Sequence, residues 1–517
     1  MTSASPAAVN PGHTGALFIG VRLGLLYGPA IWGASAAGVA LPVLTADLAV
    51  ASTAGGWVLT AHGMGLGIGT ALFGRISDSW GARRTLLAGA LALGAGAVLC
   101  LAAPTLPVLV MGRLLLGAGS GAMTCGALSL AVSGVIAQRA QVFAVLGTVM
   151  SVFSASATLV GGLVTAATSW RVTCALPGLS MLAVPLCLPV TASRPRAHRQ
   201  VDALGAALLA TAVAAVLVLI QARSLALPAP AVTVAVLLLV CATAMLARRS
   251  RRPDGFVPRR LVTNPTLRAG AAAGAGIYGG LFATMYVVPH LLAQTYGWGV
   301  EAVGAVLLPG AVVGAVVARL VGRREKSDHG LRLLAACAAA CAVCLGSAAF
   351  LPAGALVLVA GAALSFAAVA AAQVALTARV SAAIAAADRG AGIGLLTMAF
   401  FVGGAIGSAA ASALSSPLGP YGSLAVVAVS PLLAALIVRA MPPGPKQPSA
   451  PAAAASSTTG ADTPPLSVGT WPPASTDPPP PRHRKLVALA GLVAVASAAL
   501  LGLLALAALA VLGGLDV

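Results

Sequence analysis

Three side chains within the long apolar stretches of this sequence could bind a solute or a proton. They are His62, Arg113 and His290. An imidazole exchanges protons near neutral pH, and a guanidinium within an apolar stretch is costly enough to mark a functional site by default. For each histidine the alternatives are proton coupling, a structural hydrogen bond or direct substrate contact. Arg113 could instead extend its head group to the nearest membrane surface.

Four further side chains are candidate substrate contacts because they join an apolar body to a polar tip or carry an amide: Trp57, Tyr278, Tyr286 and Gln373. The tyrosines and the tryptophan could instead belong to the aromatic belts that membrane proteins place at their two interfaces.

None of the eleven acidic residues lies deep in an apolar stretch, although Asp47 and Glu301 lie near stretch ends, where either could turn inward. A site with no carboxylate and few basic residues favours an amphipathic or hydrophobic organic solute. It argues against a polyanion and against a strongly cationic drug.

The elements that must position these side chains are membrane helices. The 517 residues are 59% hydrophobic and 8% charged, whereas soluble proteins carry about 25% charged residues. The apolar runs are continuous and far longer than the ~10-residue alternating strands of a membrane β-barrel. The sequence therefore predicts an all-α integral membrane fold. The net charge of +19 does not indicate nucleic acid, because the basic residues form short clusters between apolar runs.

Fourteen spans, a break and a fifteenth span follow from the requirement of about 20 mostly apolar residues for each crossing. With a cytoplasmic N-terminus, nearly all basic loops fall inside and only Arg171 and Arg223 fall outside, which predicts a multi-pass protein of the cell inner (plasma) membrane. The predicted spans are 18–43, 55–74, 85–103, 107–131, 142–165, 173–192, 204–222, 229–247, 269–294, 300–321, 331–351, 354–378, 390–414, 421–440 and 487–513.

Residues 441–486 have a different composition, in which Pro, Ser and Ala dominate. Such a segment is typical of a disordered or polyproline-like linker. It ends in the basic cluster Arg482, His483, Arg484 and Lys485, directly before the apolar run 487–513, and this order predicts an extra transmembrane helix. The alternatives are a helix lying against the membrane or a dispensable tail.

The stretch GRISDSWGARR between the second and third spans contains Gly74, Asp78, Gly81, Arg83 and Arg84. The glycines permit close approach and a tight turn, and the carboxylate can pair with either arginine or lie at a helix N-terminus. Such a cluster can hold two helix bundles together in one state and release them in another. The stretch resembles the loop signature G-x-x-x-D-x-x-G-x-R-R of the major facilitator superfamily, so we expect a conformational-switch loop here.

Two further stretches resemble motifs of the same superfamily. GRLLLGAG places Arg113, Gly117 and Gly119 in register with the fourth-helix motif R-x-x-x-G-x-G. ATLVGG resembles the core G-P-x-x-G-G of the antiporter motif of drug-exporting branches, and it keeps Gly161 and Gly162 but has Ala-Thr in place of Gly-Pro. We expect these four glycines to serve helix packing.

The first two spans resemble the fourteen-helix drug:proton antiporters, with one difference in chemistry. VALP is retained, but Gly33 and Gly38 stand where that branch commonly has Asp and Asn. GWVLTAHG opens the second span and has His62 at a usual Tyr position. The likeness covers about residues 20–440.

The resemblance implies an actinobacterial-type multidrug or natural-product exporter with a major facilitator fold, two six-helix halves and two intervening helices. It implies transport of a small organic molecule by alternating access, with a proton as coupling ion and the lipid bilayer as partner. No enzyme and no cofactor are expected. An uncoupled facilitator or importer, or a membrane sensor or scaffold, are the alternatives. The expected divisions are 1–17 (cytoplasmic tail), 18–192 (N-terminal half), 193–268 (linking helices), 269–440 (C-terminal half), 441–486 (linker) and 487–513 (extra helix).

Overall fold

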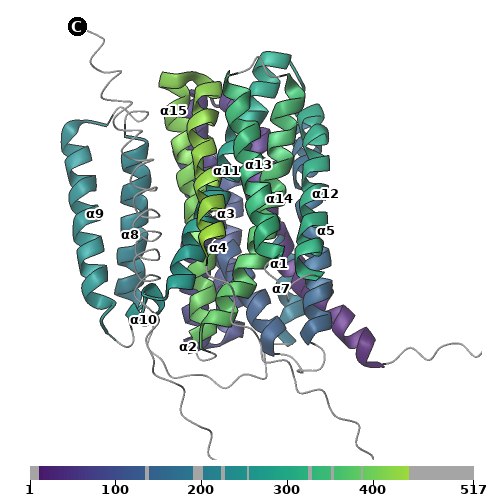
Figure 1. Ribbon diagram of the computed structural model, residues 1–517, viewed down its shortest axis with the longest axis vertical. Coiled ribbons are helices and arrows are strands. Elements are labelled where there is room, and N and C mark those ends of the chain that lie inside the picture. The colour runs from purple at the N-terminus through teal and green to yellow at the C-terminus, as the bar shows by residue number, and fades with distance from the viewer. Residues whose placement is uncertain are drawn as a thin grey trace, which may run out of the picture.

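The computed structural model describes residues 11–133, 139–189, 202–222, 227–252, 255–323, 329–350, 354–385 and 388–441. These residues form helices and short connections, with no strand among them (Figure 1). Most of the predicted linker 441–486 and the whole predicted helix 487–513 lie outside the described residues. The first helix begins at Pro11, so the last residues of the predicted 1–17 tail are helical.

The helices follow the predicted spans in order, with bounds that differ by several residues. They are α1 (Pro11–Asp47), α2 (Ser52–Trp80), α3 (Ala82–Leu101), α4 (Leu106–Ser133), α5 (Arg139–Ala167), α6 (Trp170–Ala175), η2 (Leu176–Leu179), α7 (Ser180–Cys187), α8 (Ala203–Ile220), α9 (Ala229–Arg249), α10 (Arg259–Val262), α11 (Pro265–Tyr296), α12 (Val300–Arg323), α13 (His329–Phe350), α14 (Ala355–Ala383) and α15 (Arg389–Ala440).

Twelve helices of the described part of the chain are long and apolar enough to cross a membrane. The difference from the predicted fourteen has two sources. α15 is 52 residues long, but Gly419 has the non-helical angles φ 70° and ψ 169°, so α15 consists of two arms. α2 has 29 residues and is long enough to cross, but it is not among the twelve.

The sixth predicted span is built differently from the rest. The sequence places it at 173–192, whereas the structure has a crossing at Trp170–Cys187 that is interrupted by the 3₁₀ turn η2. Pro177 lies in that turn, and a proline cannot donate to the helical hydrogen-bond ladder.

Small residues let the backbones of the bundle approach closely. If Gly403 carried a Cβ atom, that atom would lie 2.4–2.6 Å from backbone atoms of Ala275 in α11, which is too close without movement. A Cβ atom on Gly407 would lie just as close to the backbone of Gly279. Because hydrophobic burial does not drive association between helices in lipid, van der Waals contact at such small residues holds them together. Glycine and alanine residues such as these therefore lie at the interfaces between helices.

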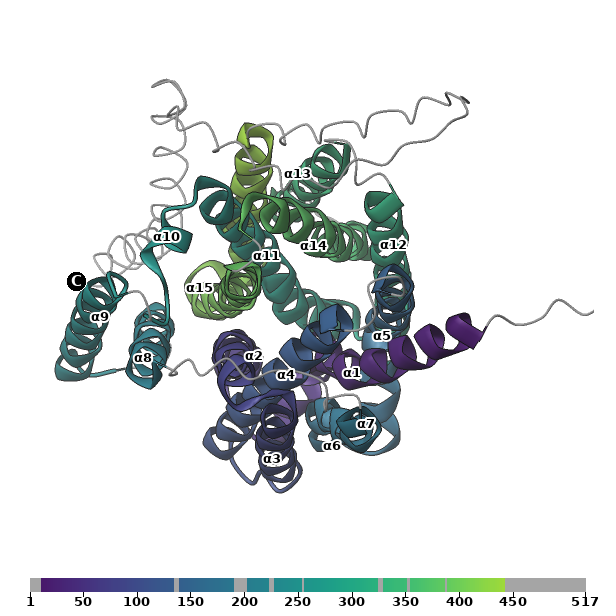
Figure 2. The same ribbon diagram turned by 90° about the horizontal axis from the view of Figure 1, so that it is seen from below.

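The helices form two groups, α1–α7 and α11–α15, which meet chiefly where α1 contacts α11, α2 contacts α15 and α5 contacts α12 (Figure 2). We call the side that carries the turn between α2 and α3 and the α9–α10 connection the basic end. The opposite side is the far end. At the far end the groups touch closely, because a Cβ on Gly162 would lie 2.7 Å from Val300 O, and one on Gly38 would lie 2.6 Å from Met285 O.

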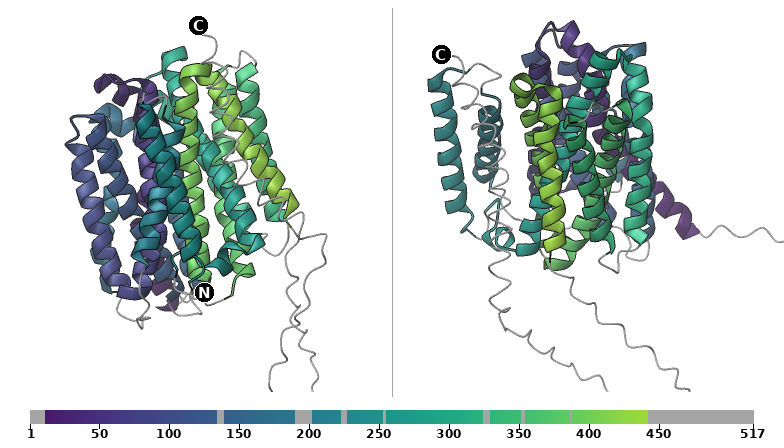
Figure 3. Two further views of the ribbon diagram at one scale, coloured as in Figure 1. Left: turned by 90° about the vertical axis from the view of Figure 1, so that its left-hand side faces the viewer. Right: turned by 45° about the horizontal axis from the view of Figure 1, so that its top comes forward.

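α8 and α9 lie beside the bundle, as the right-hand view of Figure 3 shows. α8 packs over the line where α2 meets the first arm of α15, with Leu217 against Ala405 and Ala409. α9 packs mainly on α8, and much of its apolar surface is exposed, including Leu237 at 57%.

Asp202 anchors the α8–α9 pair at the basic end. Its carboxylate accepts hydrogen bonds from the Gly205 amide at 2.9 Å, the Phe256 amide at 3.0 Å and Arg249 Nη2 at 2.6 Å. Burial would raise the pKa of Asp202, but the bonds from Arg249 and the two amides together hold it below its usual value. Arg75 of α2 donates to Phe256 O at 2.9 Å, so this anchor also reaches α2.

Candidate functional site

Arg113 is fully buried in α4, and its hydrogen bonds connect α4 to three other helices. Its guanidinium donates to Val58 O of α2 at 3.2 Å, to Cys174 O of α6 at 2.9 Å, and to Gly33 O of α1. The alternative in which Arg113 extends to the membrane surface is therefore wrong. A planar guanidinium suits this role because its donors diverge in fixed directions toward separate carbonyls.

His62 lies beside Arg113 and occupies the space that Gly33 leaves open. Its side chain is fully buried, and neither ring nitrogen makes a hydrogen bond of full geometry, although the backbone at Ala30 and Arg113 interacts with the ring. A Cβ on Gly33 would overlap the His62 Nε2 atom. An aspartate side chain at position 33 would therefore collide with the His62 ring in its present position. A titratable ring buried within a membrane bundle is a candidate functional group by default.

A neutral aromatic group lies at the centre of α11, α14 and α15. The Tyr278 ring stacks on Phe400 with centroids 5.1 Å apart and meets Phe401 edge-on at 5.4 Å. The Tyr278 hydroxyl donates to Gln373 Oε1 at 2.6 Å. Leu66 of α2 packs against the same cluster, so the group lies where the two helix groups meet. The alternative of an interfacial belt is wrong for Tyr278, which is 6% exposed.

Tyr286 and His290 form a third group, at the far end of α11. The Tyr286 hydroxyl donates to Ser52 O of α2 at 2.9 Å. His290 Nδ1 lies 2.8 Å from Tyr286 O, and its Nε2 has no partner although the side chain is 4% exposed. Tyr286 is also buried, at 2% exposure, and it links the two helix groups. Trp57 is half-buried on α2, and its indole nitrogen has no hydrogen-bond partner.

The acidic residues whose side chains are described lie at helix ends. Asp47 accepts from Trp170 Nε1 at 2.8 Å and pairs with Arg171 at 3.1 Å, with its side chain half exposed. Glu301 is exposed at the start of α12. Neither carboxylate turns inward. Across the described residues, no three His, Cys, Asp or Glu side chains gather as a metal site requires.

The predicted switch loop forms the tight turn between α2 and α3. Gly81 takes φ 86° there, and Arg83 and Arg84 are exposed. Gly74 differs from the expectation, because an added Cβ would meet only Cys125 Sγ at 3.6 Å, which is an ordinary contact. The Asp78 side chain lies outside the described part of the chain.

The four glycines expected to serve packing all lie against backbone. A Cβ on Gly117 would collide with His62 O, and one on Gly119 would lie 2.6 Å from Leu93 N. Gly161 faces Ala36 at 2.6 Å, while Gly162 faces α12 across the boundary between the two groups.

Comparison with known proteins agrees with this architecture. Residues 23–382 match the family model described as Major Facilitator Superfamily. The chain belongs to the major facilitator superfamily. This family consists of transporters and not of enzymes.

Curated relatives of this superfamily match over short segments. The puromycin resistance protein of Streptomyces alboniger is 34% identical over 26% of this chain and 27% of its own. The lincomycin resistance protein of Streptomyces lincolnensis is 32% identical over 34% of this chain and 37% of its own. The chain thus spans about a quarter to a third of the length of these relatives.

Solved structures show the same fold at low identity. A POT family transporter in complex with 5-aminolevulinic acid superposes with a TM-score of 0.59 and 13% identity, over 84% of this chain and 96% of the other. A human organic anion transporter gives a TM-score of 0.54 and 14% identity, over 83% of this chain and 100% of the other.

The sequence of this major facilitator protein named the candidate residues one by one but did not group them. The structure brings His62 to Arg113, Gln373 to Tyr278, and His290 to Tyr286, as three separate groups. It also adds Phe400 and Phe401, which the sequence signalled only as an aromatic pair in a run of Ala and Gly. Asp202 was missed as well, although an aspartate directly before an apolar helix is a typical N-cap.

Proposed function

We propose that this major facilitator protein exports a small organic molecule from the cytoplasm across the plasma membrane by alternating access, in exchange for protons. The proposal places the basic end and the N-terminus in the cytoplasm, because basic loops are retained on that side. It takes 18–192 and 269–440 as the two moving halves, with 193–268 as the linking region.

The observation that carries the proposal is the neutral aromatic group of Tyr278, Gln373, Phe400 and Phe401. Aromatic faces and one amide can hold a planar or amphipathic solute without a formal charge. The absence of a carboxylate near this group, among the described residues, argues against a strongly cationic drug. The resistance named for the Streptomyces relatives supports an antibiotic or a related natural product as the solute.

Alternating access requires the far-end contacts to break and re-form. Among the described residues, the hydrogen bonds that cross between the halves are Tyr286 to Ser52 and, about two turns farther along α2, Thr60 to Ser408 at 2.9 Å. Each bond of this kind contributes about 0.6–1.7 kcal/mol within a membrane. A few such bonds can therefore hold the outer gate closed and still allow it to open.

Proton coupling is assigned to His62. A neutral imidazole carries one N–H group and one free lone pair, so it can accept a proton arriving from outside and release it to the cytoplasm. The added charge would lie beside Arg113, and two adjacent positive charges in a buried site repel each other strongly. Protonation therefore favours a state in which the Arg113 site is hydrated and α1, α2 and α4 separate.

A cell-based assay tests export. Accumulation of a compound panel is measured in cells with and without the gene, each with and without a protonophore. We expect lower accumulation of one solute class when the gene is present, and loss of that difference with the protonophore. If the gene changes the accumulation of no compound in a broad panel, the proposal of export is wrong.

A double-variant experiment tests the coupling residue. His62→Ala should abolish the stimulation of transport by a pH gradient, and Gly33→Asp in that background should restore it, because the carboxylate enters the space left by the imidazole. His290→Ala is the matched control. If both single histidine variants keep full pH-driven transport, histidine coupling is refuted.

The second candidate function is an uncoupled facilitator. It is favoured by the position of the described acids, which lie at helix ends and not within the bundle. A counterflow assay, in which labelled solute exchanges across the membrane, separates the facilitator from the proton-coupled exporter. A facilitator exchanges the solute at the same rate with and without a proton gradient.

A further inference from the structure

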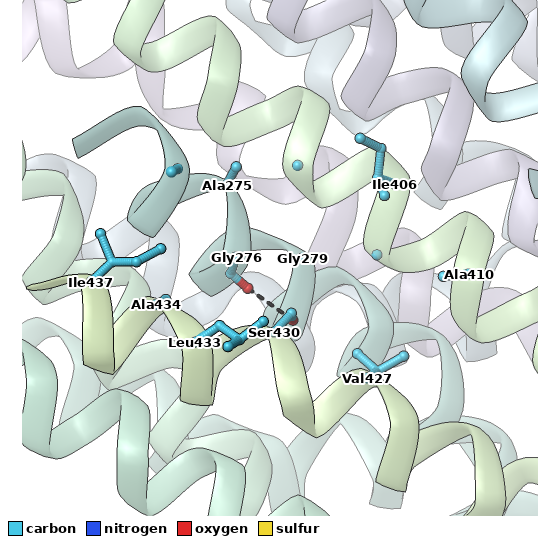
Figure 4. Close-up of a pocket in the computed structure, with 13 residues that line it drawn as sticks. Ala275, Gly276, Gly279, Ile406, Ala410, Val427, Ser430, Leu433, Ala434 and Ile437 are labelled. Carbon is cyan, nitrogen blue, oxygen red and sulfur yellow. Dashed lines mark hydrogen bonds between the residues drawn. The ribbon is translucent and has the colours of Figure 1, made fainter. Parts of the chain in front are cut away.

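A groove lined by small residues runs along the C-terminal half, away from the N-terminal half. Its volume is about 90 Å³, and all of its lining comes from α11 and the two arms of α15 (Figure 4). Gly276 and Gly279 form one wall, Gly403 and Ala410 another, and Leu433 lies on the third. The Ser430 hydroxyl donates to Gly276 O at 3.1 Å, so the single polar side chain of the lining is satisfied.

The groove lies close to α8, which packs against the first arm of α15. Ile406 connects the two, because it lines the groove and also packs against Leu217 of α8. The half-buried residues Ala272, Gly276 and Leu433 lie at its rim, so the groove can contact another helix that presents small residues. Lipid tails would leave much of that contact unmade, since they cannot match a fixed helical surface.

The segment of this chain that fits the groove is the apolar run 487–513. The second arm of α15 ends at Ala440, at the basic end, and it is followed by 441–486, the segment whose composition predicts a linker. The basic cluster at 482–485 keeps the start of the run at that same end. Even at a fraction of its full extension, a linker of this length reaches any point around the bundle.

The run 487–513 also has one face of small residues at helical spacing. Its members recur at intervals of three and four: Gly491, Ala494, Ala498, Gly502 and Ala505. The opposite face carries mostly leucine and valine, including Val493, Leu500 and Leu504. Helices in membranes associate through small residues and turn larger apolar residues to lipid.

We propose that residues 487–513 cross the membrane as a fifteenth helix and seat this small face in the groove between α11 and the two arms of α15. Ala494 and Ala498 then lie at the depth of Leu433 and Val427, judged by their distance along the helix from the basic end. Because the groove belongs wholly to the C-terminal half, the added helix moves with that half and leaves the boundary between the halves free.

Disulfide trapping in the full-length chain, after replacement of its eight cysteines, tests this contact. The test pairs are Leu433→Cys with Ala494→Cys, and Val427→Cys with Ala498→Cys. Cysteines on touching faces bring their Cβ atoms to about 3.5–4.5 Å, whereas the far side of a helix is about 10 Å away. We expect at least about five-fold more cross-linking than in the matched control, Val427→Cys with Leu500→Cys, and reversal by dithiothreitol.

Three outcomes would overturn the proposal. Equal trapping in test and control pairs means that the run does not seat by its small face. No trapping in any pair leaves lipid as the occupant of the groove. If two differently tagged copies are produced together and disulfides form only between the copies, the occupant of the groove is the helix of a second copy. None of these readouts depends on transport, so they remain decisive even if export is wrong.

Discussion

Replacement of Arg113 by methionine tests whether the buried guanidinium braces the N-terminal helices. The variant removes three charge-assisted hydrogen bonds, to the carbonyls of Gly33, Val58 and Cys174. At about 0.6–1.7 kcal/mol for each bond within a membrane, the loss is about 2–5 kcal/mol. Gly33 and Val58 lie well inside α1 and α2, where their carbonyls also accept helical backbone bonds, so the penalty is not expected to exceed this range.

Unfolding in detergent, followed by fluorescence during heating, measures the effect. For a chain of this length, a loss of this size should lower the apparent Tm by roughly 2–5 °C. Arg113→Lys should recover little of it, because an ammonium group at the end of a flexible chain cannot reach three diverging carbonyls. Arg171→Met is the control, since Arg171 lies at the exposed far end and its pair with Asp47 is open to water.

The result that would refute the reasoning is an Arg113→Met protein with wild-type Tm. If that protein also lost transport, Arg113 would act on the solute or proton and not as a brace. If it kept both Tm and transport, the three bonds would have no role in folding or function.

Three further predictions concern packing and the α8–α9 anchor. Gly407→Ala should destabilise the protein by about 1–3 kcal/mol, because its Cβ meets the backbone of Gly279; Gly147→Ala, with no atom within 4 Å of the new methyl, should leave the Tm unchanged or slightly raised. Asp202→Asn should cost about 1–3 kcal/mol because Arg249 loses its charged partner, and limited proteolysis of the α8–α9 connections should become faster. Because the pKa of Asp202 is lowered on folding, the stability that its carboxylate contributes is present at neutral pH and is lost as pH falls through the folded-state pKa. The difference in stability between wild type and Asp202→Asn should therefore shrink as pH falls below about 4. A difference that persists unchanged at low pH would contradict this prediction.

The order of the membrane helices within residues 11–441 was readable from the sequence because each crossing needs a long apolar run, and the basic loops separate these runs. The interruption near Pro177 and the turn at Gly419 were not readable from the sequence, because a helix can either continue or break at a proline or glycine within an apolar run. Only the packing of neighbouring helices decides between these outcomes.

The candidate site residues came from the sequence, but their grouping did not. His62 and Arg113 stood out as costly residues in apolar stretches, and Gly33 stood out as the position of a missing acid. That the His62 ring fills the space at Gly33 depends on how α1 and α2 approach. The interval between the two residues along the chain does not encode that distance.

Composition and loop charge by themselves determined that this is a multi-pass helical membrane protein, because burial in lipid acts on every residue independently of partners. The motif spacing added the superfamily. Tertiary structure alone decided that Arg113 binds three carbonyls and no carboxylate, that Tyr278 pairs with Gln373 between two phenylalanines, and that Asp202 anchors α8 and α9. These features depend on contacts between residues far apart in the chain, and a single sequence fixes such contacts only through the packing of all its helices together.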